Sequence, residues 1–176
     1  PDFIIVGYGK LGGIELGHGS DLDLVFIHDV DVSLSTDGER SINNQTFYTR
    51  LGQRIIHILC TRMATGELYE TDMRLRPSGN SGLLVSSLAA FEKYQSQEAW
   101  VWEHQALVRA RVVTGCSKLA NKFEAVREKV LKQSRELSTL RTEVVKMRDK
   151  MREHLGSSEA QSDQFHLKQD AGGIVD

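Results

Sequence analysis

Residues 20–27 contain two closely spaced aspartates whose carboxylates could act together in a reaction. The segment reads Ser-Asp-Leu-Asp-Leu-Val-Phe-Ile, and its β-branched and aromatic end predicts a β-strand. Because strand side chains point to opposite faces in turn, Asp21 and Asp23 share one face, about 6.5–7 Å apart. Two such carboxylates repel each other unless a cation lies between them, and Mg²⁺ or Mn²⁺ prefers oxygen ligands. The pair therefore indicates a metal site, and the plainer alternative is an edge strand whose acids face water.

The segment before these aspartates is rich in glycine. Residues 3–6 are an apolar run suited to a buried strand, and residues 7–13 read Gly-Tyr-Gly-Lys-Leu-Gly-Gly, which matches the dinucleotide-binding fingerprint. That fingerprint needs a full helix and then an acidic residue at the end of a second strand. Here residues 14–19 leave no room for such a helix, and Gly17 and Gly19 would break it. The spacing therefore excludes a dinucleotide-binding fold.

A turn that approaches a triphosphate accounts better for these glycines. Backbone N–H groups in such a turn can contact phosphate oxygens, and a lysine side chain adds a point charge. A short helical turn would then lead to the strand that carries the aspartates. The nucleotide-binding candidates in this region are Gly9, Lys10, Gly12, Gly13 and Ser20.

A third acid is available in residues 68–77, which the alternation of polar and apolar residues predicts to be another strand. Glu70, Asp72, Arg74 and Arg76 would share one face of it. We expect Asp72, in preference to Glu70, to complete a three-carboxylate metal site with the two earlier aspartates. Arg74 and Arg76 would then point toward nucleotide phosphates, for which a guanidinium is well suited. An exposed face of self-paired charges is about as good an explanation of these residues.

The composition is that of an ordinary globular domain, alone or with an appendage. The chain has 176 residues, of which 40% are hydrophobic and 26% charged, and its net charge is -2. This balance predicts attraction to neither nucleic acid nor membrane, and no apolar run approaches the ~18–20 residues of a membrane span. Cys60 and Cys116 have no metal-binding or disulfide spacing, which suits a reducing cytoplasm. Since the chain lacks an initiator Met, we expect it to be a piece of a longer protein.

The remaining segments predict mostly helices. Residues 44–61 carry a stripe that we expect to face the core, made of Phe47, Leu51, Ile55 and Leu59. Ser87 is a candidate N-cap for a helix through Tyr94. Residues 98–113, which hold both tryptophans, read as a further helix whose aromatic residues lie in the core. Its two arginines would contact phosphates or a protein substrate, or pair on the surface.

Residues 117–155 are helical and strongly charged, with an apolar stripe formed by Phe123, Val126 and Val130. The pattern leaves open whether the helix over 134–155 folds back on the core. Together these elements predict an α+β fold, a small mixed sheet flanked by helices. We expect a catalytic core over 1–115 and a helical extension over 116–176.

Five motifs together resemble one known family. They are Gly-Tyr-Gly-Lys-Leu-Gly-Gly-x-Glu-Leu at 7–16, Ser-Asp-Leu-Asp-Leu at 20–24, Asp-x-Arg-Leu-Arg-Pro at 72–77, Trp-Glu-His-Gln-Ala-Leu at 102–107, and Gly-Gly-Ile-x-Asp at 172–176. With these motifs the chain resembles, from end to end, the glutamine synthetase adenylyltransferases. That family lies within the DNA polymerase β-like nucleotidyltransferase superfamily, so the resemblance implies the polymerase β-like fold.

The resemblance also implies an activity. One half of the family's long chains transfers AMP from ATP to a tyrosine of glutamine synthetase, and the other half removes it by phosphorolysis, releasing ADP. Residues 102–111, with Ser78 after the Arg-Pro pair, are more similar to the C-terminal, adenylylating half. The implied catalytic and metal-binding residues are Asp21, Asp23 and Asp72.

The resemblance implies partners as well. Glutamine synthetase would be the protein substrate, and the PII signalling protein would act through parts of the full-length chain that are absent here. A catalytically silent nucleotide-binding or interaction module is the alternative from another class. The intact set of three acids argues against that alternative, because a silent domain does not need to keep repelling acids together.

Overall fold

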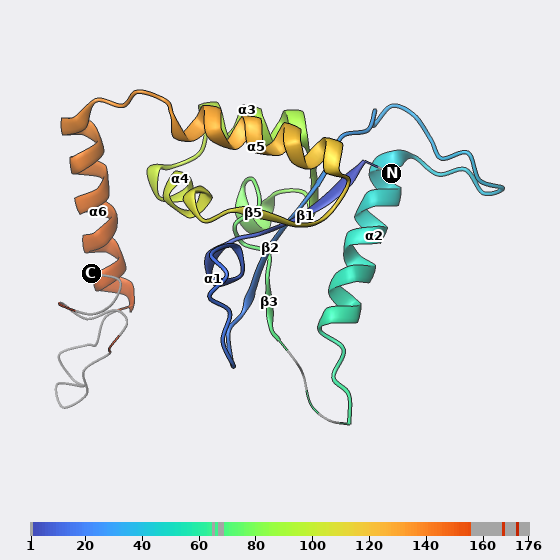
Figure 1. Ribbon diagram of the computed structural model, residues 1–176, viewed down its shortest axis with the longest axis horizontal. Helices are drawn as coiled ribbons and strands as arrows, with labels where there is room; N and C mark the ends of the chain where they lie inside the picture. Colours follow the sequence, from blue (N-terminus) through green and yellow to red (C-terminus); the bar gives the residue numbers. More distant parts are fainter. Residues whose placement is uncertain (1, 65, 67–68, 156–166, 168–171, 173–176) are drawn as a thin grey trace. The chain divides into compact units, whose positions relative to one another are not determined.

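The structure is a computed structural model that describes residues 2–64, 66, 69–155, 167 and 172 (Figure 1). The chain forms two compact units, Pro1–Gln133 and Ser134–Asp176. The first contains the β-sheet, and the second contains helix α6, Leu137–Leu155. The expected division at residue 115 stays a prediction. Helix α5, which follows that point, contributes Phe123 and Val130 to the core of the first unit.

The sheet of the first unit is mixed. Its order is β3-β2-β1-β5, and β4 also pairs with β2. The strands are β1 (Phe3–Gly7), β2 (Leu22–His28), β3 (Thr71–Asp72), β4 (Val85–Ser87) and β5 (Arg111–Gly115). Strand β1 runs antiparallel to β2 and β5, whereas β3 and β4 run parallel to β2. The antiparallel β1–β2 pair confirms that the glycine turn does not open a dinucleotide-binding crossover, which joins parallel strands.

Helices cover both faces of this sheet. They are α1 (Gly9–Gly12), α2 (Asn44–Leu59), α3 (Leu88–Gln97), α4 (Val101–Val108) and α5 (Ser117–Leu131). In Figure 1, α3 and α5 lie side by side along one face, and α2 lies apart from them. The observed α/β mixture agrees with the expected small mixed sheet flanked by helices.

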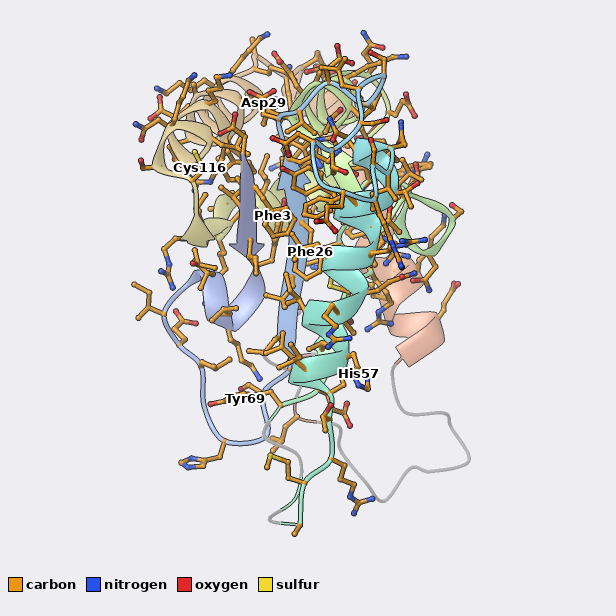
Figure 2. All side chains as sticks on the ribbon, turned by 90° about the vertical axis from the view of Figure 1, so that its right-hand side faces the viewer. Phe3, Phe26, Asp29, His57, Tyr69 and Cys116 are labelled. Carbon is orange, nitrogen blue, oxygen red and sulfur yellow. The ribbon has the colours of Figure 1, made fainter. Side chains whose placement is uncertain are left out.

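The alternation along the two central strands divides the apolar core into two clusters. Ile4 and Val25 belong to the cluster that includes residues of α3, α4 and α5, whereas Leu24 and Phe26 belong to the cluster with α2. Figure 2 shows the side chains of Phe3 and Phe26 close together in the sheet, and their ring centroids are 5.8 Å apart. Burying both faces fixes the register, because a shift of one residue would exchange the two clusters.

Several local predictions are confirmed. The Ser87 side chain caps α3 by accepting the N–H of Ala90 at 3.1 Å. Phe123, Val126 and Val130 are buried on α5. Helix α2 covers most of the predicted range 44–61.

Other predictions are wrong in whole or in part. Of the stripe expected on α2, Leu51 and Ile55 pack against the core as predicted, whereas Phe47 and Leu59 are exposed and Tyr48 and Gly52 are buried instead. Gly52 matters because a Cβ there would lie 2.9 Å from the Val85 side chain, so the helix can approach the sheet closely.

The predicted helix over 98–113 is also wrong beyond residue 108. Helix α4 ends at Val108 and strand β5 begins at Arg111, because the alternating, β-branched end of this segment pairs with β1. Trp100 is 66% exposed and Trp102 37% exposed. The prediction that these tryptophans lie in the core is therefore wrong. The charged helix over 117–155 is interrupted after Leu131, and α6 starts at Leu137.

The strand predicted over 68–77 ends at Asp72, and turns follow it. Residue 68 itself and most of the last motif, over 172–176, lie outside the described residues. Within the described ranges, no helix is both long and apolar enough to cross a membrane.

Candidate active site

The parallel pair β2–β3 places two of the three candidate acids opposite each other. Asp23 and Asp72 are register partners, as are Leu22 and Thr71. The Leu22 N–H donates to the Glu70 carbonyl at 2.8 Å, which extends the pairing by one residue. Neighbouring strands lie about 4.7–4.9 Å apart, so the two carboxyl groups start from adjacent positions although 49 positions (72 − 23) separate them in the sequence.

A cavity of about 390 Å³ opens at this end of the sheet. Acidic, amide and guanidinium groups line much of it, and Ile56 and Met73 add apolar surface. The lining residues are Asp21, Ile56, Glu70, Thr71, Asp72, Met73, Arg74 and Asn80. Asp21, directly before β2, and Asp72, at the end of β3, therefore line one cavity and give it polar groups that would bind a charged ligand.

The three acids repel one another. The pKa of Asp23 is raised, first by burial and then by the negative charges of Asp72 and Asp21. Arg74 and Lys10 oppose this shift and lower the pKa of Asp23. A half-buried acid with two like-charged neighbours is what a cation-binding or catalytic site produces.

Asp72 is held by the arginine two residues later. Its Oδ1 accepts the Arg74 backbone N–H at 2.8 Å, and its Oδ2 accepts Arg74 Nε at 2.7 Å. These hydrogen bonds lower the pKa of Asp72. Both carboxylate oxygens of Asp72 are therefore bonded to Arg74. This ion pair agrees with the alternative in which the charged residues of this segment pair with one another.

The donor set fits a hard divalent cation in its chemistry. Asp21, Asp23 and Asp72 supply only carboxylate oxygens, which Mg²⁺ and Mn²⁺ prefer, and the raised pKa of Asp23 records the repulsion that a cation would relieve. In the described part of the chain, no group of three or more His, Cys, Asp or Glu side chains has an arrangement that could hold a metal ion. Asp72 would have to exchange its contacts with Arg74 for contacts with the ion.

Arg76 organises the loop that follows. Its Nη1 donates to the Met73 carbonyl at 2.7 Å, and Nε reaches the Gly82 carbonyl at 3.5 Å. Arg74 and Arg76 were expected to share one strand face, but the strand ends at Asp72 and the two side chains go to different partners. The structure therefore places Arg74 at the acids and Arg76 in the loop.

The glycine turn packs directly against the acids. Gly9 has φ +50°, and a Cβ there would lie 2.3 Å from Oδ2 of Asp23, so only glycine fits. The Tyr8 N–H donates to the Asp23 carbonyl at 2.9 Å. The expected short helical turn is α1, Gly9–Gly12, and it lies within the glycine motif instead of after it.

Lys10, within this turn, contacts Ser20. Lys10 Nζ donates to Ser20 Oγ at 3.4 Å, and the Gly17 N–H donates to the same oxygen at 3.3 Å. Ser20 is buried. Lys10 thus lies near the acids, where its charge lowers the pKa of Asp23.

Two arginines that the sequence left unassigned contact the far end of the turn. Arg111 Nε donates to the Gly12 carbonyl at 3.1 Å, and Nη2 donates to the Leu11 carbonyl at 2.9 Å. Arg109 forms an ion pair with Glu15. The alternation of Arg109, Arg111 and the β-branched residues after them was the available sequence signal for a strand here.

Comparison with known proteins places the chain in a family. The family model described as glutamate-ammonia ligase adenylyltransferase matches residues 1–126. A protein of Pseudomonas putida named bifunctional glutamine synthetase adenylyltransferase/adenylyl-removing enzyme is 61% identical over 100% of this chain and 19% of its own length. Proteins of the same name from Hahella chejuensis and Acinetobacter baylyi are 60% and 57% identical, each over 99% of this chain. The chain spans about a fifth of the length of these relatives, 18–19%.

The family match covers the glycine turn, all three acids, Arg109 and Arg111, and it confirms the resemblance carried by the sequence motifs. The chain belongs to the glutamate-ammonia ligase adenylyltransferase family.

Proposed function

We propose that residues 1–133 form a nucleotidyltransferase of the polymerase β-like fold that transfers AMP from ATP to a tyrosine of glutamine synthetase. The observation that carries this proposal is the register of Asp23 with Asp72, beside a cavity that Asp21 and Asp72 line. Burial and the charges of Asp72 and Asp21 raise the pKa of Asp23, and this arrangement does not stabilise the fold. Metal-dependent nucleotidyl transfer uses such a set.

The three acids would hold Mg²⁺ or Mn²⁺, which would supply charge neutralisation at the phosphates of ATP. Asp72, which its hydrogen bonds with Arg74 keep ionised, would also accept the proton of the attacking tyrosine hydroxyl. The tyrosine oxygen would attack the α-phosphorus in line, and pyrophosphate would leave.

Positive side chains would bind the leaving pyrophosphate. Lys10 lies beside the acids, and Arg74 is mostly exposed, so both can reach a phosphate at the cavity. Arg76 would help by holding the loop through the Met73 carbonyl. The turn made by Gly9, Gly12 and Gly13 would let its backbone approach the triphosphate.

The relatives' names combine two opposite reactions, so the choice of half rests on local motifs. The sequence over 102–111 and Ser78 favour the adenylylating half. The second candidate is the deadenylylating half, which would use orthophosphate to release ADP from adenylylated glutamine synthetase. Both would regulate nitrogen assimilation in the cytoplasm, with the PII signalling protein acting through other parts of the full-length chain.

Mass spectrometry tests the proposal. Unmodified glutamine synthetase is incubated with this chain, ATP and Mg²⁺, and the expected result is a mass gain of one AMP. The Asp21→Asn, Asp23→Asn double variant should give no gain. A reaction only with adenylylated glutamine synthetase and orthophosphate would instead assign the deadenylylating half, and nucleotide binding without either reaction would favour a silent module.

A further inference from the structure

Arg111 contacts the glycine turn at both of its ends. Its backbone is the register partner of Gly7, the last residue of β1 before the turn. Its guanidinium donates to the carbonyls of Leu11 and Gly12, which close the turn. One residue of β5 therefore joins the entry and the exit of a segment that is remote from it in the sequence.

Arg109 holds the residues just beyond. A Cβ on Gly12 would lie 1.9 Å from the Arg109 carbonyl oxygen, and a Cβ on Gly13 would lie 2.6 Å from Nη2 of Arg109. Arg109 also pairs with Glu15. Gly12 is thus required by close packing against the Arg109 backbone, whereas a Cβ at Gly13 would meet only the flexible end of the Arg109 side chain.

The held segment includes a strained residue. Ile14 has φ +60° and is 78% exposed, so no core contact explains its conformation. For a β-branched residue the left-handed region is sterically unfavourable. Two contacts hold the next residue, Glu15, in place: its N–H donates to the Lys10 carbonyl at 2.8 Å, and its carboxylate pairs with Arg109. Strain that surrounding contacts maintain is typical of functional segments.

We propose that Arg111 is a positioning residue that fixes the glycine turn in the conformation that receives the phosphates of ATP. Its two carbonyl contacts at Leu11 and Gly12 keep Gly9 against Asp23 and Lys10 beside the acids. A turn held in this way loses little conformational entropy when the nucleotide binds. This inference rests on the nucleotidyltransferase function proposed above.

The test compares Arg111→Met with Arg111→Lys. Methionine keeps much of the side-chain length and removes all donors, whereas lysine keeps the charge but not the planar two-point contact. In the Met variant, amide hydrogen exchange in residues 8–14 should rise, and the affinity for ATP with Mg²⁺ should fall at least about tenfold. The affinity for adenosine, which has no phosphates, should stay within about twofold, and Arg111→Lys should recover only part of the ATP affinity.

Lys122→Met is the control, because it removes a cation that pairs with Asp29 at the other end of β2. Unchanged hydrogen exchange in residues 8–14 of Arg111→Met would overturn the inference. So would an equal loss of ATP and adenosine affinity, which indicates general structural damage, or full recovery by Arg111→Lys, which indicates charge alone. If the wild-type chain itself does not bind ATP, the proposed function fails, and that failure appears before any variant is compared.

Discussion

The two ends of strand β2 differ in the surroundings of their polar side chains. At its start, Asp23 lies beside Asp21 and Asp72, and burial, followed by these like charges, raises its pKa. At its end, His28 is fully buried and stacks on Tyr48 with ring centroids 5.1 Å apart. In Figure 2, Asp29, which follows His28, and Tyr69, which lies shortly before β3, mark opposite ends of the first unit.

The difference separates a site from a scaffold. The acid end keeps repelling carboxylates at a cavity, an arrangement that costs stability and is useful only with a cation or a reaction. The histidine end is filled by aromatic contacts, since Tyr48 also stacks on Phe3 at 5.8 Å. We therefore expect substitutions at the acid end to change activity and substitutions at the histidine end to change stability.

The largest expected effect is the loss of the aromatic contacts at the histidine end. Tyr48→Ala removes a side chain that is 4% exposed and contacts Phe3 and His28. We expect the free energy of unfolding to fall by about 3–5 kcal/mol, as for other large aromatic residues. Urea unfolding measures this, and AMP transfer per folded molecule should stay near the wild-type value. A stable variant without activity would contradict the separation.

The opposite pattern is expected at the acid end. Asp23→Asn should lower AMP transfer at least about 100-fold, because a metal ligand matters more than the outer contacts that already cost 10–100-fold. The melting temperature should hold or rise, since the substitution removes a desolvated charge beside two like charges. Asp29→Asn, at the far end of the strand, is the matched control and should keep its turnover.

The two ends should also respond oppositely to pH. Burial lowers the pKa of His28 from 6.5, so its stabilising contribution is full above pH 6.5 and is lost as the pH falls through the folded-state pKa. The pKa of Asp23 is raised from 3.8, so its charge destabilises the fold at neutral pH. Stability is regained as the pH falls through that raised value.

Urea unfolding between pH 7.5 and 5 tests the histidine end. In that range the stability of His28→Phe should depend less on pH than that of the wild type, because phenylalanine keeps the stacking on Tyr48 and cannot be protonated. Equal pH dependence in the two proteins would show that His28 does not contribute to the difference between the ends.

The smallest expected effect concerns the surface pair at the histidine end. Lys122 and Asp29 form an ion pair in which the lysine side chain is 48% exposed. Lys122→Met should change the free energy of unfolding by less than about 1 kcal/mol, and less still at high salt. A change of several kcal/mol would show that charge, as well as aromatic packing, stabilises that end.

The local elements could be predicted from the sequence alone. Alternation and β-branching located β2, the spacing of Gly17 and Gly19 excluded the dinucleotide-binding fold, and Ser87 marked the start of α3. These features depend on residues within a few positions of one another. The motifs also sufficed to recognise the family, whose model matches residues 1–126.

Only the tertiary structure decided which distant residues meet. It set the register of Asp23 with Asp72, and it made residues 111–115 a strand on β1, so that Arg111 reaches Gly12. The β-branched residues after Arg111 were a signal for a strand, but they did not indicate that it pairs with β1. The physical reason is that strand pairing and side-chain contacts of this kind join segments far apart in the chain, and local sequence periodicity carries no information about the partner.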